Sequence, residues 1–348
     1  MLDDMNILEQ RDPGNTRGFA ALMANQTAYE VAVEPGAPVT EQVHQIVLAG
    51  MGGSALAADM ISVLTTGWLH VPLQVVKGYE LPGFVGKNTL VIATSHSGNT
   101  EETLACYQQA RQAGCMVGVM TTGGQLLEQA MADNLPYVQL PSGGQPRMST
   151  MYHLRGLLKL LQHFYVIDNH LYDEMEDNTT WLDSHLLRWT PEVPEHENGA
   201  KRLALALAGK TAVFYGGELT WPLAYKWKIS LNESAKNMAF WNRYPEFSHN
   251  EFVGWSSHPV DKPFAVVDFR SSLERPRIRQ RMEITDQLLS GMRPKAIVVE
   301  LQGETLMQQL LWGMALADIT SIYLAVLNNV NPEPVALVEK LKQELAAL

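Results

Sequence analysis

The feature that most constrains the fold is a regular alternation of short apolar runs with helical patterns between residues 44 and 165. The apolar runs are continuous, which is typical of parallel strands covered by helices on both faces. The alternation therefore predicts a doubly wound α/β domain with a parallel sheet. The predicted strands read HQIVLAG, PLQVVKG, NTLVIATS, GCMVGVMTT and LPYVQLP, and the helices between them include GSALAADMISVLTT and NTEETLACYQQARQAG.

The second half of the chain repeats this architecture, with predicted strands that read KTAVFYGG, PFAVVDFR and KAIVVEL. The segment HQIVLAGMGGSALAADM matches TAVFYGGELTWPLAYKW, and LVIATSHSGNTEET matches AVVDFRSSLERPRI. A chain of 348 residues is long enough for two such domains. We predict an N-terminal domain over residues 1–167, a helical connector over 168–205 and a C-terminal domain over 206–348. The second copy has lost the glycine and threonine of the first, so we expect the chemistry at the first copy's loops.

Charge and cysteine content limit the cellular setting and the partners. Lys and Arg total 26 against 37 Asp and Glu, and this net charge of −11 disfavours nucleic acid or an anionic membrane as a partner. Cys106 and Cys115 are predicted to be packing residues, and without a Cys or His array we expect no structural metal. The N-terminus is acidic and we expect no apolar run of membrane-spanning length, which predicts a cytoplasmic protein.

The stretch GMGGSALAADM, residues 50–60, follows a predicted strand and opens a helix. It lacks the lysine of a P-loop and the spacing of the dinucleotide fingerprint, so neither nucleotide-binding interpretation holds. Glycines such as Gly53 let backbone N–H groups approach a ligand at a helix N-terminus, and Ser54 adds a hydroxyl. The alternative is a tight turn between a strand and a helix, with no ligand.

The stretch SHSGNTEET gives a stronger signal. Ser95, Ser97 and Thr100 place three hydroxyls next to the free N–H groups that begin a helix, which makes a neutral cradle for a phosphate dianion. Glu101 and Glu102 in the first turn suit the helix dipole. The alternative, a serine or threonine that only caps the helix, explains one of the three hydroxyls.

These two motifs resemble those of the sugar isomerase (SIS) domain, a doubly wound fold that binds phosphorylated sugars. In the second half, NESAKNMAFW and YPEFSHNEFVGW are similar to the paired motifs of the bifunctional phosphoglucose/phosphomannose isomerase family. The resemblance covers nearly the whole chain, and the motifs occur in the family's order. It implies an aldose–ketose isomerase that interconverts fructose 6-phosphate with glucose 6-phosphate and mannose 6-phosphate, without metal or organic cofactor.

Such a reaction needs a base, a ring-opening acid/base pair and a cation near the enediolate oxygens. The resemblance assigns the base to Glu233, and it assigns ring opening to His249, which the family takes from the partner subunit of a homodimer. It assigns Arg147 to the enediolate. The alternatives are a surface carboxylate paired with Lys236 for Glu233, a structural histidine among aromatics for His249, and a structural salt bridge for Arg147.

The family also has a ring-opening lysine on its last helix, here PEPVALVEKLKQEL, where Lys340 and Lys342 both qualify. We prefer Lys342, because at 100° per residue it lies at the margin of the predicted buried stripe whereas Lys340 points away. The alternative for either lysine is a solvated helix face. The residues of the predicted stripe are Val335, Val338, Leu341 and Leu345.

The sequence departs from the family's pattern at two places. The family carries a small hydroxyl residue near the start of the last helix, which is credited with processing both C2 epimers, whereas this chain has Glu333 and Val335 there. Phosphoglucose activity is therefore better supported than phosphomannose activity. His96 stands where the family usually has an aromatic residue, and it either adds positive charge near the phosphate or faces away. Two rival functions are a SIS enzyme acting on an amino-sugar phosphate or a sugar–amine adduct, and a non-catalytic sugar-phosphate sensor.

Overall fold

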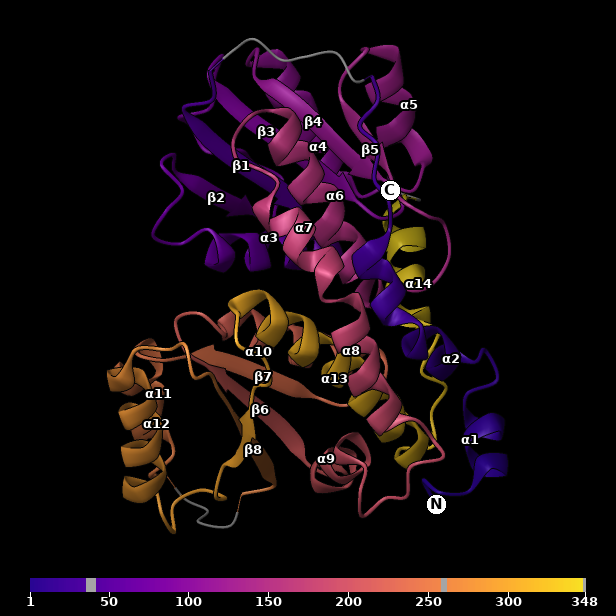
Figure 1. Cartoon of the computed structure of the whole chain (residues 1–348), viewed down its shortest axis with the longest axis vertical. Helices are drawn as coiled ribbons and strands as arrows, with labels where there is room; N and C mark the ends of the chain where they lie inside the picture. The colour runs from indigo at the N-terminus through magenta and orange to yellow at the C-terminus, as the bar shows by residue number, and fades with distance from the viewer. Residues whose placement is uncertain (36–41, 258–261, 347–348) are drawn as a thin grey trace. The chain divides into compact units, whose positions relative to one another are not determined.

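The computed structural model describes residues 1–35, 42–257 and 262–346 of the chain, which fall into two compact units (Figure 1). The first-half unit comprises Leu22–Asp183 and Gly303–Leu311. The second-half unit comprises Met1–Ala21, Ser184–Gln302 and Trp312–Leu348. The predicted connector, residues 168–205, contains α7 (His170–Asp177), α8 (Thr179–Leu186), η3 (Leu187–Trp189) and the start of α9 (Gly199–Leu207). The domain boundaries at residues 167 and 205 stay predictions.

The first-half unit is built on a parallel sheet with the strand order β2-β1-β3-β4-β5. All five strands predicted in this half are confirmed. Gly50 pairs with Thr94, so the loops that leave β1 and β3 emerge at the same edge of the sheet. The strands are β1 (Gln45–Gly50), β2 (Leu73–Val76), β3 (Thr89–Ser95), β4 (Met116–Thr121) and β5 (Tyr137–Gln139).

Helices cover both faces of this sheet, as the continuous apolar runs predict (Figure 1). On one face the side chains of Val47, Val91 and Val117 pack with residues of α4 and α5. On the other face Gly118 lies against α6, where an added Cβ would stand 3.5 Å from Leu160 and 3.1 Å from the ring of Phe164, the residue that follows the helix. The helices of the unit are η1 (Met23–Ala28), α3 (Gly52–Leu64), α4 (Glu101–Gln112), α5 (Gly124–Ala132), η2 (Pro146–Met148), α6 (Thr150–His163) and α7.

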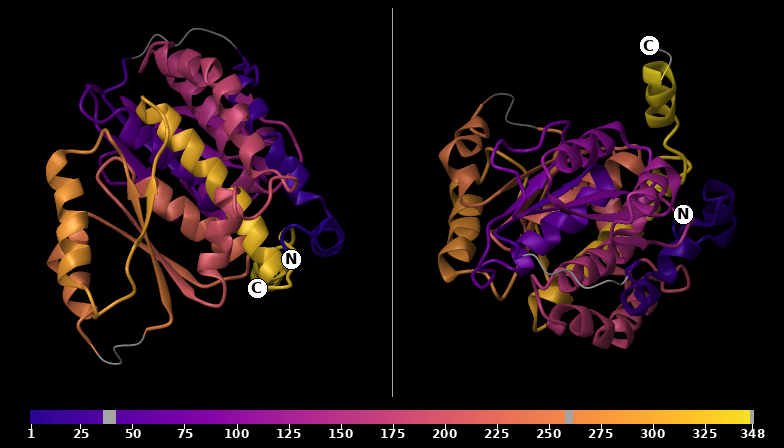
Figure 2. Two further views of the ribbon diagram at one scale, coloured as in Figure 1. Left: turned by 60° about the horizontal axis from the view of Figure 1, so that its bottom comes forward. Right: turned by 90° about the horizontal axis from the view of Figure 1, so that it is seen from above.

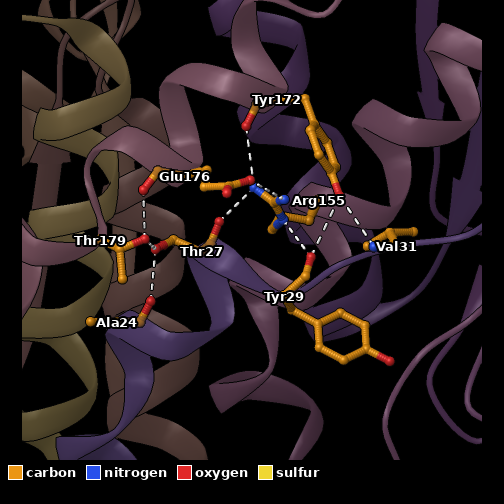
Figure 3. A network of polar contacts seen from close by, with 8 residues as sticks. All are labelled: Ala24, Thr27, Tyr29, Val31, Arg155, Tyr172, Glu176 and Thr179. Atoms are coloured by element: carbon orange, nitrogen blue, oxygen red, sulfur yellow. Dashed lines mark hydrogen bonds and ion pairs between the residues drawn. The ribbon is translucent and has the colours of Figure 1, made fainter.

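A buried arginine on α6 ties together the segments before and after the sheet (Figure 3). The guanidinium of Arg155 donates to the main-chain carbonyls of Thr27, Tyr29 and Tyr172 and pairs with the carboxylate of Glu176. It also lies 3.7 Å from the centroid of the Tyr172 ring. Since a buried guanidinium must have its N–H groups bonded, this network fixes η1 and α7 against α6.

The second-half unit is built on a parallel sheet with the strand order β7-β6-β8-β9. The three strands predicted in this half are confirmed. The sequence analysis missed β7, which reads AFWNR, because this edge strand is only partly buried and lacks a continuous apolar run. The strands are β6 (Thr211–Gly216), β7 (Ala239–Arg243), β8 (Phe264–Arg270) and β9 (Ile297–Glu300).

The second sheet is also covered on both faces, with α12 on one side and α10 and α13 on the other (Figure 2). Ile278 and Met282 of α12 pack on Val213 and Val266 of the strands. On the other face, Trp227 of α10 contacts the aromatic rings of Phe214 and Phe269. The remaining helices are α1 (Met5–Arg11), α2 (Thr16–Ala21), α10 (Trp221–Glu233), η4 (Glu246–His249), α11 (Glu251–Gly254), α12 (Pro276–Leu288), α13 (Leu306–Leu327) and α14 (Ala336–Ala346).

Two sequence-based expectations about apolar helices are wrong. Helix α13 is 22 residues long and contains an 18-residue stretch with a mean hydropathy of 1.8, so the chain does contain an apolar helix of membrane-spanning length. Of this stretch 94% is buried, as in the core helix of a folded protein. The predicted buried stripe on α14 is exposed instead: Val338, Leu341 and Leu345 are 46%, 59% and 45% exposed. The physical reason is that α14 extends away from the sheet of its unit (Figure 2, right).

Candidate active site

The turn from β1 into α3 needs glycine because another segment lies directly against it. A Cβ on Gly53 would stand 2.9 Å from the carbonyl carbon and oxygen of Pro146 and 3.1 Å from the nitrogen of Arg147. Such distances do not occur between real atoms without movement, so only glycine lets η2 approach the first turn of α3. The close approach places the predicted cationic residue, Arg147, beside the predicted phosphate loop.

Ser54, in the first turn of α3, is held between two histidines. Its Oγ accepts the backbone N–H of His96 at 3.0 Å and lies 3.4 Å from Nε2 of His153. Nδ1 of His153 is 2.8 Å from the carbonyl oxygen of Ser149, which can only accept, so Nδ1 carries the proton and Nε2 accepts from the Ser54 hydroxyl. Burial lowers the pKa of His153 to about 4, and this keeps the imidazole neutral at physiological pH.

His153 is a residue that the sequence analysis missed. It lies on α6, 99 positions from Ser54 in the chain, and no local motif marks it. His96 was singled out, and its ring lies 5.3 Å from that of His153. Burial lowers the pKa of His96, which disfavours the cation, so the structure does not support a positive charge from His96 near the phosphate.

The three hydroxyls that follow β3 form a connected group at the start of α4. Ser95 Oγ and Thr100 Oγ1 are 2.8 Å apart, and Ser95 Oγ also accepts the backbone N–H of Gly98 at 3.1 Å. Ser97 Oγ accepts the backbone N–H of Asn99 at 3.3 Å. Thr100 occupies the N-cap position of α4, yet its side chain makes no capping hydrogen bond. The capping-only alternative is therefore wrong for Thr100, whose hydroxyl bonds to Ser95.

The path of this loop depends on Gly98, which has a φ of +69°. A Cβ there would stand 1.8 Å from the carbonyl oxygen of Gly123. Asn99 fastens the same loop to α5, because its side-chain oxygen accepts the backbone N–H of Gln125 at 3.1 Å. The sequence motif therefore encodes a loop conformation as well as a set of hydroxyls.

Arg147 is fully buried on η2, and its Nη1 donates to the side-chain oxygen of Gln145 at 3.2 Å. In the first-half unit, six of the predicted site residues thus lie close together. Each of them contacts another of the six, contacts a residue next to one of them in the chain, or lies in the same loop. Gly53 lies against Arg147, Ser54 bonds to the residue that follows Ser95, and Ser95 bonds to Thr100. The sixth, Ser97, is in the same loop. The result is a group of hydroxyls at two helix starts, with the backbone of Arg147 packed against one of them.

The other three predicted catalytic residues belong to the second-half unit. Glu233 ends α10 and is partly buried. The ammonium of Lys236 donates to the main-chain carbonyl of Glu233 at 2.9 Å and to that of Asn331 at 2.7 Å, which fixes the turn after α10. His249 ends η4 and is exposed, although its neighbour Phe247 is fully buried. This exposure does not fit a histidine whose hydrogen bonds are satisfied in the core.

Neither lysine of α14 is singled out by the structure. Lys340 and Lys342 are both exposed, and Nζ of Lys342 lies 2.9 Å from a carboxylate oxygen of Glu339. The buried stripe that favoured Lys342 is absent from the described part of α14, so the choice between them stays open. Within residues 1–35, 42–257 and 262–346, no group of three His, Cys, Asp or Glu side chains is placed to hold a metal ion.

Comparison with known proteins agrees with the resemblance seen in the motifs. The model of a bacterial phospho-glucose isomerase C-terminal SIS domain matches residues 196–345. A D-glucosamine-6-phosphate 4-epimerase from Sulfolobus acidocaldarius is 28% identical over 90% of this chain and 94% of the relative. A solved glucose-6-phosphate isomerase-like protein from Thermus thermophilus, 19% identical, has a TM-score of 0.64 over 98% of each chain, which supports the fold.

A stronger match settles the family. A bifunctional phosphoglucose/phosphomannose isomerase from Caldicellulosiruptor bescii is 35% identical to this chain over 326 residues, which cover 93% of the chain and 96% of the relative. The chain therefore belongs to the bifunctional phosphoglucose/phosphomannose isomerase family.

Proposed function

We propose that this protein is an aldose–ketose isomerase that interconverts fructose 6-phosphate with glucose 6-phosphate and mannose 6-phosphate. The observation that carries the proposal is the group of hydroxyls and helix N–H groups around Ser54, Ser95 and Thr100, in a chain of this family. A phosphate dianion suits such a site, because helix N-termini and hydroxyls donate hydrogen bonds to it. The overall charge of −11 makes a local anion-binding device necessary.

The proposed reaction moves one proton between neighbouring carbons. His249 and a lysine of α14, Lys342 or Lys340, open the sugar ring by transferring a proton from the anomeric hydroxyl to the ring oxygen. Glu233 then removes the proton from C2 of the aldose to give an enediolate, a hydroxyl proton passes from O2 to O1, and Glu233 returns its proton to C1 to give the ketose. Arg147 stabilises the negative charge that develops on the enediolate oxygens, because a guanidinium stays charged throughout.

The proposal includes a homodimer in which His249 reaches the partner's site. Two observations support it. His249 is exposed rather than buried in its own unit. Helix α14 presents exposed apolar side chains, Leu337 and Leu341 among them at 84% and 59%, which a second copy of the chain would cover. A cytoplasmic location also belongs to the proposal, and it is supported by two cysteines that are both free and buried.

A second candidate function is 4-epimerisation of an amino-sugar 6-phosphate. It is favoured by the D-glucosamine-6-phosphate 4-epimerase of Sulfolobus acidocaldarius, which matches 90% of this chain. The same phosphate site would serve both reactions, because the 6-phosphate is common to the two substrates. The difference lies at C2, where an amine replaces a hydroxyl, and at the carbon whose configuration changes.

The test is a coupled assay of the purified protein on fructose 6-phosphate, with glucose 6-phosphate and mannose 6-phosphate detected separately. We expect turnover that falls at least a thousandfold in Glu233→Gln, because the amide cannot accept the proton from C2. Glu197→Gln is the matched control, since Glu197 is an exposed carboxylate beside His196. It should keep the full rate.

The same samples are offered glucosamine 6-phosphate, and the product is examined for inversion at C4. Turnover of fructose 6-phosphate that survives in Glu197→Gln and is lost in Glu233→Gln establishes the isomerase. If the protein converts glucosamine 6-phosphate but not fructose 6-phosphate, it is the epimerase and not the isomerase. A folded protein that binds fructose 6-phosphate without converting either substrate would indicate a sensor. The ratio of the two hexose products measures how Glu333 and Val335 affect epimer preference.

A further inference from the structure

The two halves of the chain can be matched residue by residue at their strand ends. Gly50 pairs with Thr94 in the first sheet, and Tyr215 pairs with Asp268 in the second, so that Gly216 and Phe269 are the next positions. From there to the next helix both loops have the same length, because α4 begins at Glu101 and α12 begins at Pro276. This register matches Gly50 with Gly216 and Thr94 with Phe269, the latter as in the repeat of LVIATSHSGNTEET and AVVDFRSSLERPRI, and it shifts the other sequence repeat by one residue. Counted on from these positions, the equivalent pairs are Gly53 with Leu219, Ser54 with Thr220, Gly98 with Leu273 and Asn99 with Glu274.

In the second half the position of the proposed phosphate site is occupied by a carboxylate of the chain itself. Glu274 is 4% exposed, and its Oε1 accepts the backbone N–H of Leu219 at 2.8 Å and lies 3.3 Å from the hydroxyl oxygen of Thr220. These two donors are the counterparts of the Gly53 N–H and the Ser54 hydroxyl. A Cβ on Gly217 would stand 2.2 Å from the same carboxylate oxygen, so the carboxylate fills the loop closely.

The surroundings of Glu274 are those of a bound anion. It faces the first turn of α10, a helix of 13 residues, whose N-terminus carries partial positive charge. Its second oxygen, Oε2, is buried and has no hydrogen-bond partner among the described residues. On balance burial raises the pKa of Glu274, although the hydrogen bonds from Leu219 and Thr220 oppose this effect. A helix N-terminus also binds free anions. The buried carboxylate of Glu274 therefore stands where such an anion would bind, and one of its oxygens accepts no hydrogen bond there from the described residues.

We propose that Glu274 is a resident anion that closes a second phosphate-type site, and that removing its carboxylate opens this site to a phosphate dianion. The second-half unit thus keeps hydrogen-bond donors equivalent to those of the first site, but their acceptor is the Glu274 carboxylate of the chain itself. Phosphate has more acceptor oxygens than one carboxylate and carries more charge, so it satisfies the vacated N–H and O–H donors. The proposal concerns only the second-half unit and stands whether or not the isomerase function holds.

The experiment counts binding sites for inorganic phosphate by isothermal titration calorimetry. Four proteins are compared: the natural chain, Glu274→Ala, Ser54→Ala/Ser95→Ala, and the triple variant that combines all three changes. We expect the natural chain to show one phosphate site and Glu274→Ala to show two. The double variant should bind phosphate at least tenfold more weakly than the natural chain, and the triple variant should again show one site. The matched control is Glu218→Gln, because Glu218 is a more exposed carboxylate in the loop that Glu274 contacts, and it pairs with Arg275 at 3.5 Å. It should leave one site.

A second variant separates loss of charge from loss of bulk. Glu274→Gln still fills the loop and should gain no site, and Glu274→Ser should gain one if Glu274→Ala does not fold. A folded Glu274→Ala or Glu274→Ser with the same number of phosphate sites as the natural chain would overturn the proposal. Failure of the proposed isomerase site gives a different pattern: the natural chain would bind no phosphate while Glu274→Ala binds one.

Discussion

The loop after β3 and the loop after β8 occupy equivalent places in two copies of one fold, yet they meet the adjacent helix start in opposite ways. The first carries Ser95, Ser97 and Thr100, and no side chain of the loop caps the start of α4 at Thr100. The second carries Glu274, which bonds to the neighbouring helix start itself. Under the two proposals above, both copies keep one anion-binding geometry, and a few side chains decide whether the site is open to a ligand or filled by the chain itself.

The two loops also differ in backbone conformation. Gly98 has a φ of +69°, whereas Leu273 at the equivalent position is not among the described residues with positive φ. A side chain at position 98 would meet the carbonyl of Gly123, while Leu273 is 41% exposed. The first loop is therefore folded tightly over α5, and the second has room for a large residue. Comparing matched substitutions in the two loops tests this difference.

The largest expected effect comes from Gly98→Ala. We expect it to lower the free energy of unfolding by about 3 kcal/mol, because it combines a left-handed backbone angle with a close contact to a carbonyl. Leu273→Ala, its counterpart, should lower it by about 1 kcal/mol from lost burial. Urea unfolding of both variants measures the pair. Equal losses would show that the two loops are under the same constraint.

The next effect is a pH dependence of opposite sign in the two units. Burial lowers the pKa of His153 to about 4, so unfolded chains bind more protons below about pH 6.5 and stability falls on acidification between pH 6.5 and 4. Burial raises the pKa of Asp268 to about 6 despite Arg293 and Arg270, so the folded state binds more protons and stability falls as pH rises from about 4 to 6.

Two variants separate these contributions. In the natural chain, His153 adds stability as pH rises from 4 to 6.5. His153→Gln lacks this gain, so over that pH range its free energy of unfolding should fall by about 3 kcal/mol relative to that of the natural chain. Asp268→Asn should gain about 3 kcal/mol between pH 4 and 6. Urea unfolding at several pH values measures both slopes. Slopes of the same sign, or no change from the natural chain, would contradict the assignment of these buried groups.

The smallest effect concerns two equivalent hydroxyls. Ser54→Ala should raise the KM for fructose 6-phosphate about fivefold, because the hydrogen bonds of Ser54 to His96 and His153 hold the loop at the proposed phosphate site, and one such bond is worth about 1 kcal/mol. Thr220→Val should leave KM unchanged and lower the unfolding free energy by about 1 kcal/mol, since Thr220 Oγ1 accepts the backbone N–H of Gly217 at 2.7 Å and contacts Glu274. A rise in KM in Thr220→Val would mean that the loop after β6, which contains Thr220, also takes part in substrate binding.

Most of the fold was predictable because the strands are continuous apolar runs, and burial of apolar side chains on both faces of a sheet leaves a direct trace in sequence. The edge strand β7 was missed because it is only partly buried. The grouping of Ser95, Ser97 and Thr100 was also predictable, since these hydroxyls lie within a few residues of one helix start. His153 was not, because the bond to Ser54 joins residues that are distant in the chain.

The sequence by itself therefore determined the two parallel sheets, the hydroxyl motif at α4 and the resemblance that defines the family. Only the tertiary structure decided three things: that η2 needs Gly53 in order to lie against α3, that His153 holds Ser54, and that the carboxylate of Glu274 fills the loop after β6. It also reversed the expected burial of α14. The physical reason is that secondary structure follows from local patterns, whereas which donor meets which acceptor depends on the packing of segments that the sequence keeps apart.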